Sequence, residues 1–140
     1  MAFAVGHPEL IESLGRVKDT MDSGVFTAIQ RTAQYALGPD FERLLAGVAA
    51  PYRARRQELV GVLEQAGYEV FPAGATFYVW CRVRGGEDSA TYCRRALAET
   101  GVVVTPGTGF GSGGEGWFRI SLTASEADLA EGARRLAGWR

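Results

Sequence analysis

The first third of the chain places apolar residues at helical spacing, after a short apolar run. Residues 2–5 are all apolar, a pattern typical of a buried parallel strand. A helix is predicted from Pro8, because proline suits the first helical turn and Glu9 suits the positive end of the helix dipole. Gly24 lies in the break that ends this helix, and a second helix is predicted over residues 25–36.

A third and longer helical segment follows. Asp40 is placed to cap its beginning, and apolar residues keep helical spacing as far as residue 66. Pro51 predicts a kink or a restart within this segment. Gly67 is placed to end the helix in a left-handed conformation.

Beyond Gly67 the pattern changes to short strands that alternate with helices. Strands are predicted over residues 68–71, 76–83, 102–104 and 117–122, and helices over residues 89–100 and about 125–139. Gly101 is placed to close the first of these helices, and Ser125 with Asp128 resembles a capping box that opens the second. The order β-β-α-β-β-α indicates an α/β fold of the α+β kind, a small sheet with helices packed on it.

Composition and charge exclude several classes of function. Of the 140 residues, 46% are hydrophobic and 22% charged, which is ordinary for a soluble globular protein, and the net charge is −1. This charge gives no reason to expect binding to nucleic acid or to an anionic membrane. No apolar stretch reaches the roughly 20 residues of a membrane helix, and no signal peptide is visible, so a cytoplasmic protein is expected.

The cysteine and histidine residues do not form a metal motif. Cys81 and Cys93 lack the close pairing of zinc ligands, and His7 is the only histidine, so no metal site is expected. Both cysteines are interpreted as small, buried apolar residues.

Arg119 is the first candidate for chemistry, in the predicted strand that ends at Leu122. Because side chains alternate along a strand, Trp117, Arg119 and Ser121 share one face, and the apolar residues between them face the core. An arginine on that face can bind a carboxylate through two parallel hydrogen bonds. The spacing alone nevertheless favours an ordinary surface arginine, since most arginines are exposed.

Two further candidates are weaker. The glycine-rich run from Gly107 to Gly116 is of a kind that can cradle a phosphate, but it leads into a strand and has no P-loop lysine. A plain connecting loop is therefore favoured over a nucleotide site. Lys18 is the only lysine, and it lies on the polar face of a helix, so a solvated side chain is expected rather than a Schiff base.

Several segments match one known family in order and in spacing. Along the chain they are Phe3–Leu10, Asp22–Phe26 with Ala28–Gln30, Tyr52 with Arg55 and Arg56, Ala73–Trp80, and Pro106–Gly111 leading to Glu115–Leu122. With these segments the chain resembles the class I and II aminotransferases, which belong to the fold-type-I pyridoxal-phosphate superfamily. In detail it resembles the branch that contains LL-diaminopimelate and aspartate aminotransferases.

The resemblance implies a fold and a domain organisation. The chain would be the C-terminal part of such an enzyme, with a small, mostly antiparallel sheet and helices packed on it. Residues 1–38 would be a remnant of the large-domain edge with the interdomain helices, and residues 39–140 the small C-terminal domain. The run at residues 2–5 would be a strand of the large domain.

The resemblance also implies a function. Arg119 stands where the family has the arginine that binds the α-carboxylate of the substrate. The intact enzyme would transfer an amino group between an amino acid and a 2-keto acid through pyridoxal phosphate. The family's Schiff-base lysine would fall before Met1, and Lys18 does not match its motif. This chain would then contribute no catalytic or cofactor-binding residue, and would neither bind pyridoxal phosphate nor be active alone.

Two alternatives and one consequence remain open at this point. The chain can instead be a non-catalytic interaction or binding domain derived from an aminotransferase. A nucleotide-binding domain built on the glycine-rich run is a third hypothesis, in which replacing Gly109 and Gly111 abolishes ATP binding. A homo-oligomer is expected in any case, because the apolar run and the helices at the beginning of the chain would otherwise be exposed.

Overall fold

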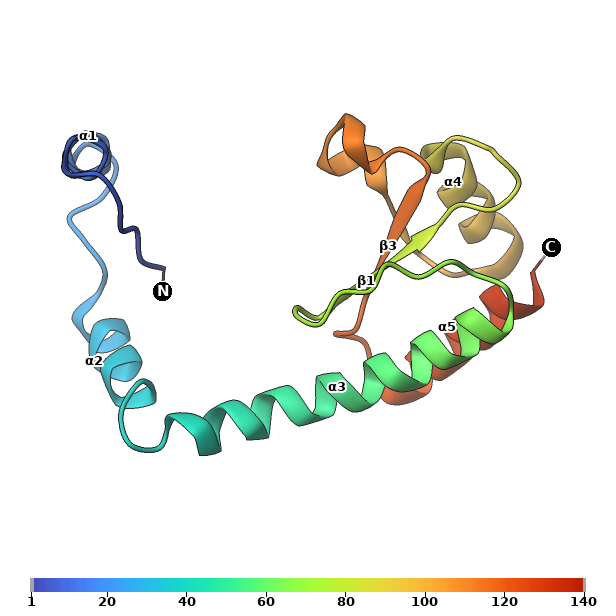
Figure 1. Cartoon of the computed structure of the whole chain (residues 1–140), viewed down its shortest axis with the longest axis horizontal. Helices are drawn as coiled ribbons and strands as arrows, with labels where there is room; N and C mark the ends of the chain where they lie inside the picture. The colour runs from blue at the N-terminus through green and yellow to red at the C-terminus, as the bar shows by residue number, and fades with distance from the viewer. Residues whose placement is uncertain (1, 140) are drawn as a thin grey trace. The chain divides into compact units, whose positions relative to one another are not determined.

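The computed structural model describes residues 2–139, and the chain divides into two compact units, Met1–Val48 and Ala49–Arg140 (Figure 1). The boundary between residues 38 and 39, which the resemblance implies for the family's domains, stays a prediction. No helix within residues 2–139 has both the length and the apolar character needed to cross a membrane.

The first unit contains α1 (Pro8–Asp19), α2 (Thr27–Ala36) and the beginning of α3 (Phe41–Gln65). Pro8 opens α1 as predicted, and His7 is its N-cap residue. The strand predicted for residues 2–5 does not form. A strand needs a neighbour to supply its hydrogen bonds, and no such neighbour pairs with this segment among the described residues.

Helix α3 differs from the prediction at its beginning, while the kink predicted at Pro51 stays a prediction. It continues through Pro51 without a restart, although proline removes one backbone donor there. The Asp40 carboxylate, expected to cap the helix, instead accepts a hydrogen bond from Arg43 Nε at 3.1 Å. The end of the helix is as predicted, since Gly67 follows it with a φ of 85°.

The second unit is built on a three-stranded antiparallel sheet. Strand β3 (Trp117–Ser121) lies in the middle, between β1 (Tyr78–Arg82) and β2 (Thr105–Pro106). The small antiparallel sheet is thus confirmed, but two predicted strands are shorter than expected or displaced. Residues 68–71 add only the bridge of Val70 to Cys81, and residues 102–104 precede β2 instead of forming a strand.

Helices cover one face of this sheet and form the core with it. The core comes from the second part of α3, from α4 (Ser89–Thr100) and α5 (Glu126–Gly138), and from β1 and β3. Its largest fully buried side chains include Phe118, Leu63 and Leu122. Both cysteines are buried as predicted, and burial raises the pKa of Cys81 to about 12 and that of Cys93 to about 11.

The ends of α4 and α5 agree with the sequence analysis. The Asp88 carboxylate accepts from the Thr91 backbone N–H at 2.9 Å and caps α4, and Gly101 closes that helix with a φ of 71°. Ser125 caps α5 by accepting from the Asp128 N–H at 3.1 Å.

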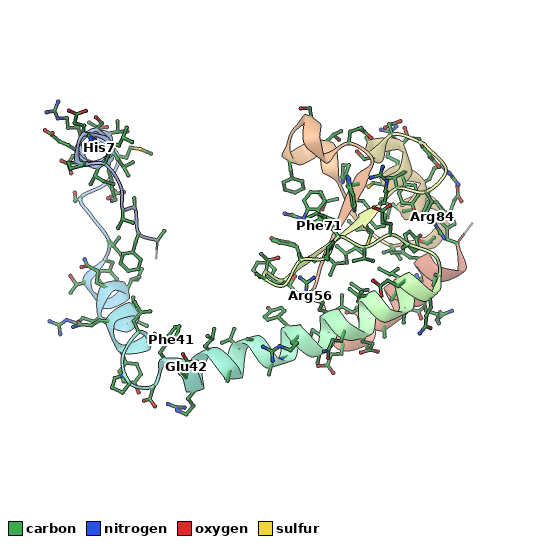
Figure 2. The ribbon with its side chains drawn as sticks, in the orientation of Figure 1. His7, Phe41, Glu42, Arg56, Phe71 and Arg84 are labelled. Atoms are coloured by element: carbon green, nitrogen blue, oxygen red, sulfur yellow. The ribbon has the colours of Figure 1, made fainter. Side chains whose placement is uncertain are left out.

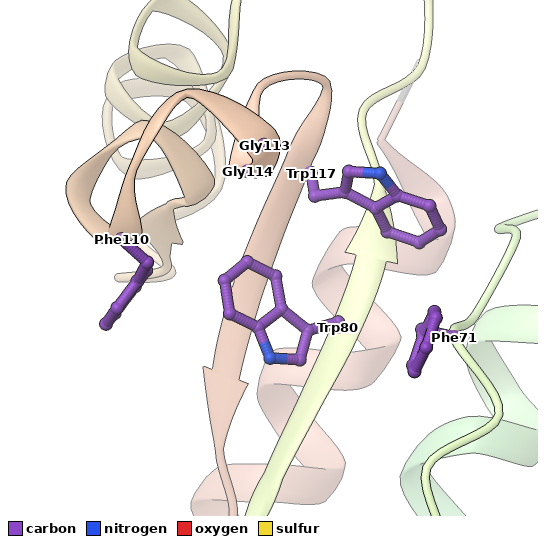
Figure 3. A pocket seen from close by; sticks show the side chains of 6 residues that line it. All are labelled: Phe71, Trp80, Phe110, Gly113, Gly114 and Trp117. Atoms are coloured by element: carbon purple, nitrogen blue, oxygen red, sulfur yellow. The ribbon is translucent and has the colours of Figure 1, made fainter.

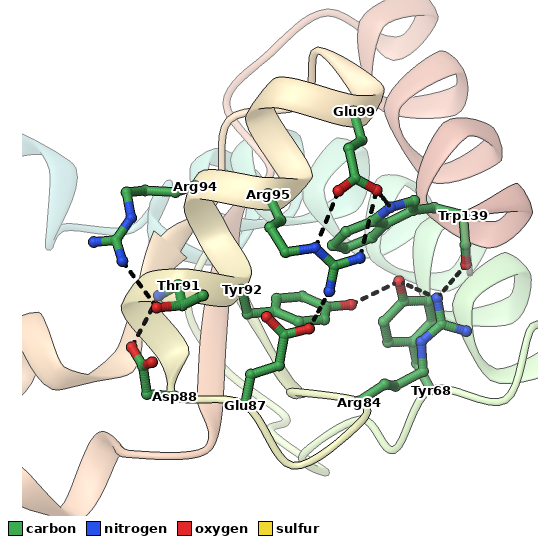
Figure 4. Close-up of polar contacts among 10 residues, drawn as sticks. All are labelled: Tyr68, Arg84, Glu87, Asp88, Thr91, Tyr92, Arg94, Arg95, Glu99 and Trp139. Atoms are coloured by element: carbon green, nitrogen blue, oxygen red, sulfur yellow. Dashed lines mark hydrogen bonds and ion pairs between the residues drawn. The ribbon is translucent and has the colours of Figure 1, made fainter.

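The end of the chain is held against the core by Arg84 and Trp139 (Figure 4). The Arg84 guanidinium lies 3.9 Å from the centre of the Tyr68 ring and donates to the Tyr68 hydroxyl at 2.7 Å and to the Trp139 carbonyl at 2.6 Å. Trp139 is buried, packs on Tyr92 and donates from Nε1 to Glu99 at 2.6 Å. Burial is also the main cause of the raised pKa of the Tyr68 hydroxyl.

Candidate functional site

Arg119 lies in the middle of the central strand, β3, on the face that the helices leave uncovered. Its register partners are Trp80 on β1 and Thr105 on β2. The neighbouring residues Phe118 and Ile120 are buried in the core, so the predicted alternation of faces along β3 is confirmed. Arg119 is neither fully exposed nor packed in hydrocarbon, because its burial is intermediate.

Two aromatic rings flank the Arg119 guanidinium. Its Cζ atom lies 3.8 Å from the centre of the Tyr78 ring and 4.1 Å from the centre of the Phe110 ring, over the face of each. Tyr78 belongs to β1, on one side of β3, and Phe110 to the 3₁₀ helix η1 (Gly107–Phe110), which follows β2 on the other side. Within residues 2–139, the guanidinium makes neither a hydrogen bond nor an ion pair with another residue. Its N–H edge is available to a ligand.

The same face of the sheet carries an aromatic cavity of about 410 Å³ (Figure 3). Its lining residues are Phe71, Trp80, Phe110, Gly113, Gly114 and Trp117. Trp80 meets Phe110 edge to face with ring centres 5.3 Å apart, and Phe71 meets Trp117 in the same way at 6.1 Å. Arg119 does not line this cavity, so Phe110 is the residue that the cavity and the guanidinium share.

The glycine-rich run is a tightly held connecting loop. It forms η1 and a second 3₁₀ helix, η2 (Ser112–Gly114), and then leads into β3. The Glu115 carboxylate accepts hydrogen bonds from the Ser89 N–H at 2.7 Å, the Gly116 N–H at 2.8 Å and the Ser89 hydroxyl at 3.4 Å. The Ser89 hydroxyl also lies 3.3 Å from that of Thr108. The loop is therefore fixed to the first turn of α4, and the interpretation as a connecting loop agrees with this geometry.

An arginine of α3 holds the segment that leads into β1 (Figure 2). Arg56 donates to the backbone carbonyls of Ala75 at 3.1 Å, Thr76 at 3.2 Å and Tyr78 at 2.6 Å. Thr76 has a φ of 69°, a left-handed conformation that is strained for a β-branched residue. The three hydrogen bonds stabilise this conformation, and they fix the backbone from which the Tyr78 ring reaches Arg119.

Sequence reasoning located Arg119 and its face, but it missed the residues that surround it. The sequence pattern indicates only a glycine-rich loop around Phe110, and it predicts no role for Glu115. The role of Arg56 could have been found from the sequence. Arg55 and Arg56 are adjacent on a helix that packs on the core, and such a pair indicates polar partners nearby.

The chain matches a known protein family over almost its whole length. The family model of the class I and II aminotransferases matches residues 1–136. The chain belongs to this family.

Aminotransferases with similar sequences are longer than this chain. An LL-diaminopimelate aminotransferase of Nitratidesulfovibrio vulgaris strain Hildenborough is 50% identical over 139 residues, which cover 98% of this chain and 35% of the relative. One from Natranaerobius thermophilus is 41% identical, over 99% of this chain and 36% of the relative. The chain thus spans about a third of the length of the curated relatives it matches.

Solved aminotransferase structures have the same fold. A probable N-succinyldiaminopimelate aminotransferase from Thermus thermophilus matches with a TM-score of 0.81 and 32% identity, over 95% of this chain and 35% of that one. The L,L-diaminopimelate aminotransferase of Chlamydomonas reinhardtii matches with a TM-score of 0.80 and 26% identity, over 97% of this chain and 33% of that one. The expected fold, a part of a fold-type-I aminotransferase, is confirmed.

Family membership implies pyridoxal phosphate in the full-length enzymes, and Lys18 is the one lysine in this chain. Lys18 lies on α1 in an ion pair with Asp22, and both side chains are about half exposed, 46% and 50%. The hydrogen bond from Lys18, with one from the Gly24 N–H, lowers the pKa of the Asp22 carboxyl. A lysine that forms a Schiff base is instead activated by burial or by a neighbouring cation. The described residues also contain no cluster of metal-ligating side chains.

Proposed function

We propose that this chain provides the arm that binds the substrate carboxylate in an aminotransferase, with Arg119 as the residue that binds the α-carboxylate. One observation supports this role above the others: a half-buried guanidinium, flanked by two rings, has no acidic partner within residues 2–139. A cation taken partly out of water without a partner costs free energy, and a ligand carboxylate offsets that cost.

The chemistry of the guanidinium suits this ligand. Its planar fork donates two parallel hydrogen bonds to the two oxygens of a carboxylate, which fixes the orientation of the ligand as well as its position. In a complete aminotransferase, this contact aligns the substrate so that the reacting bond is correctly placed. The relatives are named for LL-diaminopimelate, and this supports an amino acid of that kind as the substrate.

We further propose that the chain has no aminotransferase activity by itself. Its one lysine is paired with Asp22 on a helix surface, outside the buried surroundings that activate a lysine as a nucleophile. The purified chain incubated with pyridoxal phosphate should show no bound cofactor after dialysis and no transamination. Retained cofactor absorbance or measurable amino transfer would contradict this part of the proposal.

A second candidate function is that of a non-catalytic interaction domain, and exposed apolar side chains favour it. Leu10, Val17 and Phe26 of the first unit are 69%, 58% and 72% exposed, although each is a large apolar residue. Such surface is normally covered by another chain or segment. We expect a homo-oligomer, which light scattering after size-exclusion chromatography would detect; a monodisperse monomer would contradict that expectation.

Direct binding tests the role of Arg119. The chain with ¹⁵N-labelled arginine is titrated with L-alanine, and the Arg119 Nε–Hε signal is followed by NMR at constant ionic strength. L-alaninamide, which has no carboxylate, is the matched ligand, and Arg94→Gln on the exposed face of α4 is the matched variant. We expect L-alanine to shift the Arg119 signal to the same extent in wild type and in Arg94→Gln, and alaninamide to leave it unchanged; Arg119→Gln identifies the signal by its loss. Equal responses to the two ligands would contradict the proposed role.

A further inference from the structure

Phe110 contacts the Arg119 guanidinium through the face of its ring. An arginine on a half-exposed strand face has several rotamers, and a ligand that binds it must order them at a cost in free energy. Here the faces of the Tyr78 and Phe110 rings lie 3.8 and 4.1 Å from the Cζ atom. Stacking on ring faces uses the planar faces of the guanidinium and leaves the N–H donors at its edge unused. That edge is the part that matches a carboxylate.

The two rings differ in how they are held. Tyr78 is part of β1, next to the central strand, and its backbone carbonyl accepts from Arg56. Phe110 lies outside the sheet, at the end of η1, and is 50% exposed. Its position therefore depends on the loop. An edge-to-face contact with Trp80, with ring centres 5.3 Å apart, supports it from the side of the cavity.

The loop is fixed at both ends of the segment that contains Phe110. Before it, the Thr108 hydroxyl lies 3.3 Å from that of Ser89. After it, the Glu115 carboxylate accepts from the Ser89 N–H at the first turn of α4. A carboxylate at that end of a helix interacts favourably with the helix dipole as well as with the donor. Ser89 is fully buried, so the anchor point itself belongs to the core.

We propose that Phe110 is a positioning residue for Arg119, and that the anchoring of its loop by Glu115 and Ser89 sets the affinity of the arginine for carboxylates. This inference rests on the proposed function, because it assumes that Arg119 binds a carboxylate. The inference gives Phe110 a role in carboxylate binding, although Phe110 touches no reacting atom and acts only through Arg119. Phe110 holds the guanidinium with its edge open, so that the ligand does not have to order it.

The test uses the full chain, with L-alanine as the ligand and the Arg119 Nε–Hε signal as the readout. Phe110→Leu keeps an apolar side chain but removes the ring face, and we expect binding about fivefold weaker. The same change should remove part of the ring-current shift of the Arg119 signal before ligand is added. Phe110→Tyr restores a ring face and should restore both values.

Phe71→Leu is the matched control. Phe71 is 52% exposed, close to the 50% of Phe110, and it contacts Trp117 instead of Arg119. Its replacement should leave the affinity unchanged. If Phe110→Leu does not fold, Glu115→Gln provides a second variant, since it leaves the ring in place and weakens the anchor. We expect binding at least about twofold weaker there.

The outcomes separate this inference from the proposed function. If wild type binds L-alanine and Phe110→Leu binds equally well with an unchanged Arg119 signal, the positioning role is wrong and the role of Arg119 stands. If Phe71→Leu weakens binding as much as Phe110→Leu, the effect is not specific to the stacked ring, and the inference is again wrong. If wild type does not distinguish L-alanine from alaninamide, the proposed function itself fails.

Discussion

Gly107 and Gly114 pack backbone against backbone, so neither position has room for a side chain. A Cβ atom built on Gly107 would collide with the Gly114 carbonyl oxygen and lie 2.7 Å from the Trp117 carbonyl oxygen. These two glycines are needed for a close approach within the protein, which explains both of them without a phosphate ligand. The contact also fixes the loop that contains Phe110.

Gly107→Ala should destabilise the protein by about 1–3 kcal/mol, because the methyl group forces the loop away from Gly114. Gly109→Ala is the matched control, since a Cβ there meets nothing within 4 Å. Urea unfolding gives the free energy of unfolding of each variant. The NMR titration with the ligand L-alanine reports whether the binding site at Arg119 is affected. Equal stability of the two variants would show that the packing of this loop is looser than the structure indicates.

Arg84 should contribute strongly to stability through the end of the chain. Arg84→Lys keeps the positive charge but cannot donate from one planar group to Ala66, Tyr68 and Trp139 together. We expect a loss of about 1–3 kcal/mol in the free energy of unfolding. Arg94→Lys, on the exposed face of α4, should cost less than about 0.5 kcal/mol. If both variants lose a similar free energy of unfolding, the hydrogen bonds of Arg84 stabilise the protein no more than a surface contact does.

The two buried thiols predict a loss of stability at alkaline pH. Burial raises the pKa of Cys81 from 9.0 to about 12 and that of Cys93 from 9.0 to about 11. Above pH 9 the unfolded chain releases these protons and the folded chain keeps them, so the free energy of unfolding decreases as the pH rises. The contribution is complete below pH 9 and is lost as the pH passes through the folded-state values. Each thiol contributes at most about 1.4 kcal/mol per pH unit.

Urea unfolding at several values between pH 8 and pH 10.5 measures this slope. Cys81→Ala and Cys93→Ala should each be less stable than wild type at pH 8, because they leave cavities, but their stability should fall less steeply with pH. A slope in the double variant as steep as that of wild type would assign the alkaline effect to other groups, such as the Tyr68 hydroxyl.

The sequence predicted local features more reliably than those that depend on distant partners. The helix ends predicted at Gly101 and Ser125 were correct, because each depends on a few neighbouring residues. Residues 2–5 were predicted as a strand from their apolar character, but a strand also needs a hydrogen-bonding neighbour that no local pattern supplies. The same reason explains why residues 102–104 are not a strand.

In the candidate site, too, the sequence predicted the local feature and missed the contacts between distant residues. The alternation along β3 placed Arg119 on the correct face from six residues of sequence. Nothing local connects it to Phe110, which reaches the guanidinium because β2 and its loop return alongside the central strand. Three-dimensional neighbours of this kind follow from the topology, and the spacing of residues in the sequence does not contain them.

Reconstitution of an active enzyme tests the central claim most directly. The chain is combined with pyridoxal phosphate and with the part of the Nitratidesulfovibrio relative that it does not match, and amino transfer from LL-diaminopimelate to a 2-keto acid is measured. We predict activity only with both chains present, and a kcat/KM for the amino acid that is roughly a hundredfold lower in Arg119→Gln but unchanged in Arg94→Gln. An Arg119→Gln complex that assembles and is as active as wild type would contradict the account.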